Sequence, residues 1–460
     1  MIKQCFNPYL PSWEYIPDGE PHVFDGRVYI YGSHDRFNGW VFCLNDYVCW
    51  SAPEDDLSDW RYEGVIYQKT DDPLNKDGRM CLYAPDVTVG PDGRYYLYYV
   101  LDKVSVISVA VCDSPAGKYK FYGYVRYPDG TRLGERRDDE PQFDPGVLTE
   151  GDVTYLYTGY CPPADHSKMG AMASVLEADM LTVKEGPVFI APNECRGKGT
   201  SFEGHEFFEA SSIRKHDGVY YFIYSSKAAN ELCYAISKHP LKGFEYGGVI
   251  VSNCDLHIDS YKPADKRVYP EGNNHGSIVR INGKWYIFYH RQTNGTWFSR
   301  QGCMESIEIK NDGTIEQVEI TSGGAGSPLN GRGEYPAYIA CNLFRDGEAG
   351  GPAAKITQDG RDGDEEQGYI ADITDSTVIG FKYFDCKGIK KVCIKTRGYC
   401  GGVFELRTSL EGAALGGIAV ESTNIWTEFS ACFAVPDGIH ALYFMYKGAG
   451  KASLASFTLE

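Results

Sequence analysis

The sequence predicts an all-β protein: a five-bladed β-propeller followed by a β-sandwich domain. Two observations lead to this prediction, an unusual composition and a hairpin pattern that returns five times. Aromatic residues make up 14% of the chain, with 35 Tyr, and there are 52 Gly. Aromatic side chains favour pleated strands and glycine favours tight turns, so this composition is typical of β structure. Helical periodicity is nearly absent from the first two thirds of the chain.

The recurring pattern is a turn glycine, usually preceded by Asp or Asn, followed by an alternating aromatic strand. Such dipeptides are a strong hairpin signal, because the central turn residues adopt positive φ. Five near-equal repeats predict five blades around an axis. The alternative is a β-sandwich with accidental spacing, but a sandwich gives no reason for the same hairpin to return. The turn glycines lie 58 to 67 residues apart, at Gly26, Gly93, Gly151, Gly218 and Gly283.

The end of the repeat near residue 318 sets the predicted domain boundaries. Residues 1–318 form the predicted propeller, and the Gly/Ser-rich segment 319–334 is interpreted as a linker. Residues 335–460 contain further alternating runs, which predict a second all-β unit, a sandwich.

Charge and cysteine content limit the partners and the compartment. The net charge is −18 and no basic run interrupts it, which argues against nucleic acid as a partner. No apolar stretch is long enough to span a membrane. The N-terminus lacks an apolar signal core, and the 15 Cys show no zinc-binding spacing. These features predict a cytoplasmic protein with reduced thiols.

An ionisable residue lies seven to nine positions before each turn glycine. In a propeller these positions are equivalent and face the central axis, so the five side chains would converge at one end of the channel. Taken singly, each Asp could be a turn or strand cap. As a set they indicate a function, because clustered carboxylates raise one another's pKa and proteins seldom keep them without a use. The residues are Asp18, Asp86, Asp144, Glu209 and His275.

Two carboxyl groups in opposite protonation states can hydrolyse a glycoside. The ionised one deprotonates water, and the protonated one donates its proton to the leaving oxygen. Inverting enzymes need roughly 6.5–9.5 Å between the two groups to fit the water.

The motifs around these positions resemble glycoside hydrolase family 43 over about residues 1–320. The resemblance runs through Asn7-Pro8-Tyr9 with Pro17-Asp18, Ala84-Pro85-Asp86, Phe143-Asp144-Pro145, Phe208-Glu209-Ala210 and Asn274-His275-Gly276. It implies that Asp18 is the general base, that Glu209 is the general acid, and that Asp144 orients the acid and raises its pKa. It further implies a Ca²⁺ ion near His275, with Arg300 paired to Asp144. No organic cofactor is implied.

Further substrate-binding residues are predicted from their sequence positions. Trp13 and Phe202 lie near the catalytic motifs and could stack on sugar rings. Arg291 could bind the substrate or pair with a surface carboxylate, and Arg300 is a further candidate. Asp86 could bind a sugar hydroxyl, although a structural role is favoured.

Residues 335–460 resemble carbohydrate-binding module family 6, in which an aromatic pair clamps a sugar. Tyr369 and Trp426 match that pair. The usual acidic pair near the start of the module is replaced here by Ala340-Cys341-Asn342, so a structural role against the propeller is favoured.

The expected function is removal of terminal α-L-arabinofuranosyl units from arabinoxylan-derived oligosaccharides, by an exo-acting, inverting enzyme. β-Xylosidase or dual activity is the near alternative. An endo-acting arabinanase or xylanase and a non-catalytic sugar-binding propeller are the others.

Overall fold

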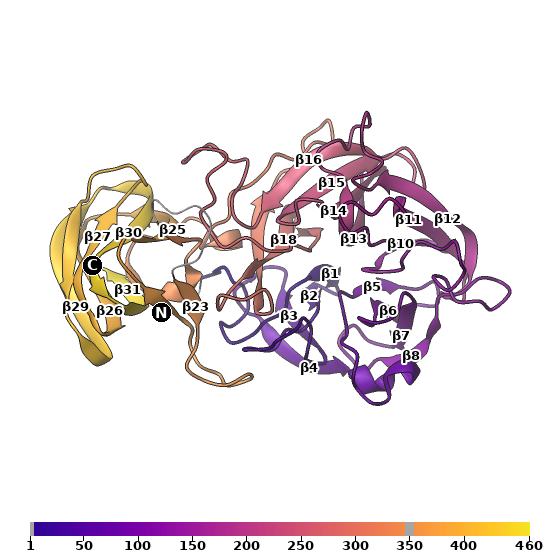
Figure 1. Ribbon diagram of the computed structural model, residues 1–460, viewed down its shortest axis with the longest axis horizontal. Helices are drawn as coiled ribbons and strands as arrows, with labels where there is room; N and C mark the ends of the chain where they lie inside the picture. The colour runs from indigo at the N-terminus through magenta and orange to yellow at the C-terminus, as the bar shows by residue number, and fades with distance from the viewer. Residues whose placement is uncertain (1–3, 346–353) are drawn as a thin grey trace.

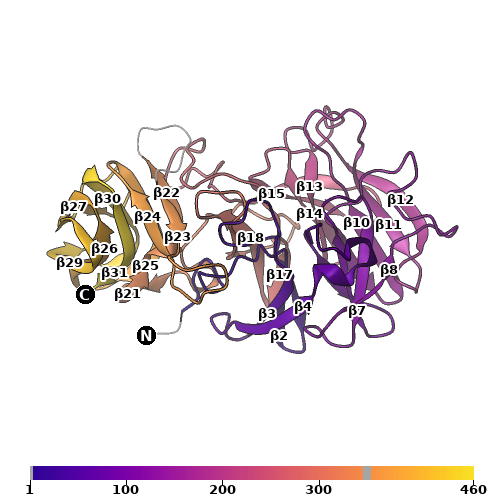
Figure 2. The ribbon, with the colours of Figure 1, turned by 60° about the horizontal axis from the view of Figure 1, so that its bottom comes forward.

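The computed structural model describes residues 4–345 and 354–460. Strands β1 to β19 lie at one end of the elongated molecule and strands β20 to β31 at the other (Figures 1 and 2). Helical structure in the described ranges is confined to three-residue 3-10 turns, so the all-β prediction is confirmed. These turns are η1 (Lys69–Asp71), η2 (Pro73–Asn75), η3 (Gly324–Gly326) and η4 (Ala337–Ile339). In these ranges no helix has the length and apolar character needed to cross a membrane.

The first 19 strands form five antiparallel sheets, each made of consecutive strands. The first sheet contains β1 (Glu20–Phe24), β2 (Arg27–Tyr31), β3 (Tyr47–Pro53) and β4 (Arg61–Tyr67). The second contains β5 (Asp86–Val89), β6 (Tyr95–Val100), β7 (Ile107–Cys112) and β8 (Lys120–Tyr124). The third contains β9 (Gly146–Glu150), β10 (Val153–Thr158), β11 (Gly170–Leu176) and β12 (Val183–Pro192).

The fourth sheet contains β13 (Phe207–His216), β14 (Val219–Ser226), β15 (Glu231–Ser237) and β16 (Glu245–Ser252). The fifth has three strands, β17 (Ile278–Ile281), β18 (Lys284–Gln292) and β19 (Arg300–Ile307). Each of the five predicted turns joins the first two strands of a sheet. At Asn282 and Gly283, for example, φ is 46° and 82°, as expected for a tight hairpin turn.

The first strands of the five sheets lie next to one another. Strand β1 contacts β5 and β17, and β9 contacts β5 and β13. A hydrogen bond of 2.7 Å between the hydroxyls of Ser212 and Ser277 joins β13 to the segment leading into β17. In Figure 1 β1, β5 and β13 lie toward the middle of this part, whereas β4, β8, β12 and β16 lie toward its rim. The segments that enter the first strands are therefore brought together.

The remaining strands form two six-stranded sheets. One contains β20 (Leu329–Asn330), β22 (Asn342–Arg345), β25 (Thr377–Cys386), β27 (Cys400–Arg407), β28 (Gly416–Val420) and β30 (Gly438–Gly450). The other contains β21 (Gly333–Pro336), β23 (Lys355–Thr357), β24 (Tyr369–Ile373), β26 (Ile389–Gly398), β29 (Thr423–Val435) and β31 (Ala452–Leu459).

The segment predicted as a linker packs against both parts of the chain. Strand β20 pairs with β25 and β21 pairs with β31, both within or next to the predicted linker range of 319–334. The preceding turn is also anchored, because Glu305 accepts hydrogen bonds from the Thr321 amide and hydroxyl, both 2.7 Å long. Small residues let the chain pass close to neighbouring backbone here, so the Gly/Ser content reflects tight packing and not flexibility.

The two parts of the molecule share a continuous buried core. It extends from Tyr221 and Tyr289 in the fourth and fifth sheets to Ile370 and Phe457 in the C-terminal sheets. A buried ionic group also spans the junction: the Lys382 ammonium lies 3.0 Å from a carboxylate oxygen of Asp255 and 3.0 Å from one of Glu319. The C-terminal unit is therefore firmly attached to the part that carries the candidate site.

Candidate active site

The predicted ionisable residues occupy comparable places in the five sheets. Asp18, Asp144 and His275 lie two or three residues before β1, β9 and β17, Asp86 opens β5, and Glu209 is the third residue of β13. Because the first strands adjoin one another, their entrances gather these side chains. Asp144 lies 3.8 Å from the His275 imidazole, and its pKa is affected by the charges of Glu209 and Asp18.

The backbone at the carboxylates adopts conformations that non-glycine residues rarely use. Asp18 and Asp144 have φ values of 58° and 43°, in the left-handed region. Ala210, next to Glu209, has a φ of 69°, and the pairing of β13 with β14 shifts register between Glu209 and Ser212. Such bulges redirect side chains, and backbone strain of this kind gathers at functional sites.

Arg300 holds Asp18 in its ionised form. Its Nη1 donates a 2.9 Å hydrogen bond to Oδ1 of Asp18. The same guanidinium is fixed by the buried Asp35, through bonds of 2.8 Å from Nε and 3.0 Å from Nη2. Burial alone would raise the pKa of Asp18, but the charge of Arg300 holds it below its usual value. Asp18 is thus suited to act as a base.

His290 positions the backbone of Asp18. Its Nε2 lies 2.8 Å from the Asn273 carbonyl, so Nε2 carries a proton and donates. The unprotonated Nδ1 then accepts a 3.2 Å hydrogen bond from the backbone amide of Asp18. Burial lowers the pKa of His290 to about 3, which agrees with this neutral form.

Glu209 has the opposite electrostatic environment. Burial and the charge of Asp18 raise its pKa to about 8, and no described residue donates a hydrogen bond to its carboxyl group. Asp144 also has a raised pKa, because of burial and repulsion from Glu209. Asp144, however, accepts a 3.0 Å hydrogen bond from the Ala210 amide, which favours its ionised form. Of Glu209 and Asp144, Glu209 is therefore the group that is more readily protonated.

The expected partner of Arg300 is corrected by these contacts. The family resemblance implied a pair with Asp144, but the arginine bonds to Asp18 and Asp35 instead. Asp35 and His290 were not predicted, because they stand outside the repeated positions. Their only sequence signal is that both are ionisable residues close to a strand of the first or fifth sheet.

The contacts of Asp86 agree with the favoured structural role and not with the alternative of sugar binding. Its carboxylate is fully buried and accepts 2.7 Å bonds from His22 and the Val87 amide. Its other oxygen accepts a 2.8 Å hydrogen bond from the backbone amide of Val147, which connects the second sheet to the third. Both oxygens are occupied by protein donors, and none is left for a substrate.

Two further substrate-binding predictions are wrong. Phe202 is buried and packs on Tyr224 and Tyr246 in the core of the third and fourth sheets. Arg291 is also buried: it donates to the carbonyls of Ala340 at 3.1 Å and Asn7 at 3.2 Å, where it joins the two parts of the chain. Closeness in sequence to the catalytic motifs did not place either residue at the site.

Aromatic residues do stand near Arg300, on two loops that meet there. Phe42, whose ring lies 4.7 Å from the Arg300 guanidinium carbon, stacks edge-to-face with Phe298. Trp40 and Trp297 belong to the same two loops and are 71% and 53% exposed. Trp13, the predicted sugar-stacking residue, is partly exposed.

The C-terminal unit supports one of these loops. The backbone amide of Phe37 donates a 2.7 Å hydrogen bond to Oδ1 of Asp362. The side-chain amide of Asn45 donates a 3.0 Å hydrogen bond to Oδ2 of the same carboxylate. Both partners lie in the loop between β2 and β3, which also carries Asp35. The second domain thus braces a wall of the candidate site.

The aromatic pair predicted to clamp a sugar in the C-terminal unit is occupied by an arginine. Tyr369 and Trp426 meet edge-to-face, with ring centroids 5.2 Å apart. The Arg397 guanidinium carbon lies 4.9 Å from the first ring and 4.2 Å from the second. Asp359 binds both Tyr369 and Arg397 at 2.7 Å. This closed arrangement favours the structural role.

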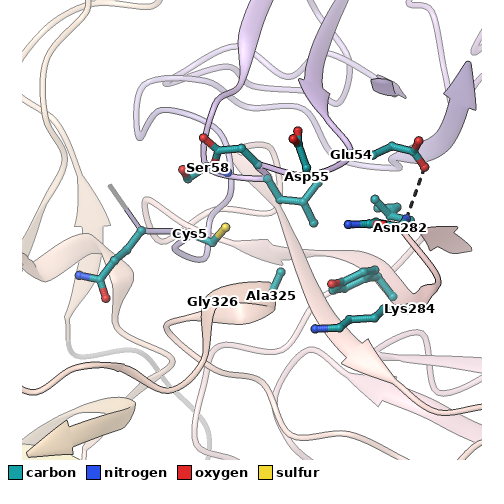
Figure 3. A pocket seen from close by; sticks show the side chains of 13 residues that line it. Cys5, Glu54, Asp55, Ser58, Asn282, Lys284, Ala325 and Gly326 are labelled. Carbon is teal, nitrogen blue, oxygen red and sulfur yellow. Dashed lines mark hydrogen bonds between the residues drawn. The ribbon is translucent and has the colours of Figure 1, made fainter. Parts of the chain in front are cut away.

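A hollow of about 400 Å³ lies away from the carboxylates (Figure 3). Its wall includes Cys5, Glu54, Asp55, Asn282 and Lys284. The turn at Asn282 follows β17, whereas His275 precedes that strand, so the hollow is at the opposite end of the sheet. It is separate from the candidate site.

The site thus combines an ionised carboxylate, held by an arginine, with a neighbouring carboxyl group whose raised pKa favours its protonated form. This combination provides the base and the acid for hydrolysis of a glycosidic bond. The fold and the site together define a glycoside hydrolase.

Sequence comparison identifies the family. The profile of glycosyl hydrolases family 43 matches residues 16–315, and the chain belongs to that family. A xylosidase/arabinosidase of Thermoclostridium stercorarium is 73% identical over 100% of this chain and 99% of its own length. A xylosidase/arabinosidase of Bacteroides ovatus is 29% identical, over 68% of this chain and 97% of its own.

Solved structures agree with this assignment. One is a family 43 β-xylosidase/α-arabinofuranosidase from a compost microbial metagenome, in complex with xylotriose and in a calcium-free form. It is 28% identical, with a TM-score of 0.52, over 67% of this chain and 96% of its own. An arabinoxylan arabinofuranohydrolase of Bacillus subtilis has the same fold over 98% of this chain and 97% of its own, with a TM-score of 0.54 and 22% identity.

Proposed function

We propose that this glycoside hydrolase removes terminal α-L-arabinofuranosyl units from arabinoxylan-derived oligosaccharides, and that it also accepts terminal β-xylosyl units. We further propose that its five sheets are the blades of a propeller, with the site at the end of the axis where the first strands begin. The observation that carries the catalytic proposal is the contrast between Asp18, held ionised by Arg300, and Glu209, whose pKa is raised to about 8.

The reaction follows from these protonation states. Asp18 takes a proton from water while the water oxygen attacks the anomeric carbon, and the bond to the leaving oxygen breaks as Glu209 donates its proton. Asp144 orients Glu209, and solvent then restores both groups. The charge of Asp18 raises the pKa of Glu209, yet no hydrogen bond joins the two carboxyl groups. An arrangement of this kind suits a water-mediated, inverting displacement.

The choice of sugar rests on relatives and on the exposed aromatic residues. The Thermoclostridium relative is named for both xylosidase and arabinosidase activity. Trp40 and Trp297, on loops next to Arg300, offer apolar faces of the kind that sugar rings stack against.

The sugar preference is tested by comparing 4-nitrophenyl α-L-arabinofuranoside with 4-nitrophenyl β-D-xyloside. We expect hydrolysis of both, with the larger kcat/KM for the arabinoside. Proton NMR of the first product should show the inverted anomer. A xyloside kcat/KM about tenfold or more above the arabinoside value, a difference of about 1.4 kcal/mol, would contradict the arabinosyl preference. Cleavage confined to internal bonds of arabinan would contradict exo action.

A calcium ion near His275 is the second part of the proposal. The residues fit such an ion in one respect: Oε1 of the buried Glu20 has no hydrogen-bond partner and lies 3.9 Å from Nε2 of His275. Arg214 binds the other oxygen of Glu20 at 2.6 Å and already neutralises part of the local charge. Because calcium selects oxygen ligands, Glu20 would ligate the ion and His275 would bind it through water. The ion would add positive charge beside the imidazole that faces Asp144.

Calcium binding would appear as a change in thermal stability. We expect that adding Ca²⁺ to protein treated with EGTA raises Tm, because an ion bound only by the folded state stabilises it. Differential scanning fluorimetry measures the shift, with Glu20→Gln as the variant that should lose it. An unchanged Tm at millimolar Ca²⁺ would argue against the ion.

A further inference from the structure

A second group of metal-binding side chains lies in the fourth sheet, apart from the catalytic carboxylates. It consists of His205, Glu231, Cys233 and His257. His205 lies two residues before β13, Glu231 and Cys233 are at the start of β15, and His257 is in the connection between β16 and β17. Three separate segments supply the group, which explains why no zinc-binding spacing is visible in the sequence.

Three of these residues have possible ligand atoms that lie close to one another, and His257 approaches the group at Glu231. One atom each from His205, Glu231 and Cys233 can be chosen within 4.8 Å of the others. Nδ1 of His205 lies 2.7 Å from Oε1 of Glu231, and Sγ of Cys233 lies 3.5 Å from the same oxygen. On the other side, Nε2 of His257 lies 3.6 Å from Oε2 of Glu231.

Glu231 has one buried oxygen that the protein leaves unsatisfied. Its side chain is 1% exposed. Oε1 accepts bonds from Ser226 and His205, whereas Oε2 has no hydrogen-bond partner. Leaving a buried carboxylate oxygen unpaired is costly, so such an atom requires an explanation. A cation bound beside Oε2 would satisfy it.

The types of donor indicate which cation. Imidazole nitrogen, carboxylate oxygen and thiolate sulfur together suit zinc and similar divalent transition metals, whereas calcium and magnesium select oxygen. Zinc–ligand distances of roughly 2.0–2.3 Å in a tetrahedron place neighbouring ligand atoms roughly 3.3–3.7 Å apart. Sγ of Cys233 lies 3.5 Å from Oε1 of Glu231, which agrees with this spacing, whereas Nε2 of His257 lies 3.6 Å from Oε2. A shared ion would therefore be bound by both oxygens of the carboxylate. The 2.7 Å contact of His205 would have to open.

The group is accessible from one side and closed on the other. The side chains of His205 and His257 are 30% and 55% exposed, which provides an entrance for an ion. Cys233 is buried and forms the floor. The His205 ring is held by stacking on Tyr246, with ring centroids 4.8 Å apart. Ordered ligands at the base and a reachable ligand at the rim are what a metal site needs.

We propose that His205, Glu231, Cys233 and His257 bind one divalent transition-metal ion of the zinc type. The ion displaces the proton of the Cys233 thiol, which passes to the buffer, and is bound by the resulting thiolate, the carboxylate and the two imidazoles. It ties the segment before β13, which leads in four residues to Glu209, to the connection between β16 and β17. The ion therefore stabilises the segment that leads to the general acid, Glu209.

The test uses Co²⁺ and Zn²⁺ as probes on full-length protein without a histidine tag, after removal of metals with a chelator. We expect one equivalent of Co²⁺ to bind and to produce a thiolate-to-cobalt charge-transfer absorption, which Zn²⁺ then abolishes. Cys233→Ala should lose this absorption, and His257→Ala should weaken binding at least about tenfold. The matched control is His239→Ala, since His239 is exposed in another turn of the same sheet.

Each outcome decides for or against the site. Circular dichroism shows whether Cys233→Ala is folded, and the exposed His257 gives a second variant that does not disturb the core. Zn²⁺ should raise the Tm of the unaltered protein and of His239→Ala, but not that of His257→Ala. Absence of a saturable Co²⁺ signal would overturn the proposal. Binding that is unchanged in both Cys233→Ala and His257→Ala would also overturn it.

Discussion

Replacing Glu209 with glutamine is expected to lower kcat on arabinoxylan-derived oligosaccharides by about 10²–10⁴-fold, the usual contribution of a general acid. The substitution keeps the size of the side chain but removes the proton that the leaving oxygen needs. Substrates with a 4-nitrophenyl leaving group should lose much less, because nitrophenolate departs without protonation. Comparison of kcat for the two kinds of substrate measures the effect.

The pH dependence gives an independent readout of the same role. Glu209 must be protonated to act, and burial together with Asp18 raises its pKa to about 8. The kcat/KM of the unaltered enzyme should therefore fall as the pH rises through about 8, and Glu209→Gln should lack this decline. The matched control is Glu203→Gln, an exposed glutamate in the preceding turn. Equal losses on both kinds of substrate would contradict the assignment of Glu209 as acid.

The repeated hairpins made the all-β class and the positions of the carboxylates at the strand entrances predictable from sequence. Each turn dipeptide fixes the local backbone, and the repeat fixes where the preceding strand begins. Asp18, Asp144, Glu209 and His275 therefore gather where the sequence placed them. Local signals of this kind can be recognised in the sequence because they depend on neighbouring residues only.

The residues that tune the carboxylates could not be predicted in this way. Asp35 meets Arg300 across 265 positions of the chain, so no local pattern connects them. Phe202 lies seven residues before Glu209, yet it packs into the core between two sheets. Arg291 is buried against the backbone carbonyls of Ala340 in the second domain and Asn7 near the N-terminus. In each case the role is decided by long-range packing, which one sequence does not reveal.

The second large effect is expected from Asp18→Asn, which should reduce kcat by about 10²–10⁴-fold on every substrate. Asparagine has the shape of aspartate, but it cannot take a proton from water. The loss should be equal for 4-nitrophenyl glycosides and oligosaccharides, because attack by water is needed whatever the leaving group. This uniform loss distinguishes the base from the acid, and steady-state kinetics on the same pair of substrates measures it.

The acidic side of the pH profile should follow the same residue. Arg300 holds the pKa of Asp18 below its usual value, so the unaltered enzyme should keep its base ionised to a lower pH than an unpaired aspartate would. The matched control is Asp25→Asn, since Asp25 is exposed in the β1–β2 turn and also has a left-handed φ, of 48°. The control tests whether the backbone tolerates the change. If Asp18→Asn kept more than about a tenth of the activity while Asp25→Asn was unaffected, the water would have another base. The contacts of Arg300 with Asp18 would then have only a structural purpose.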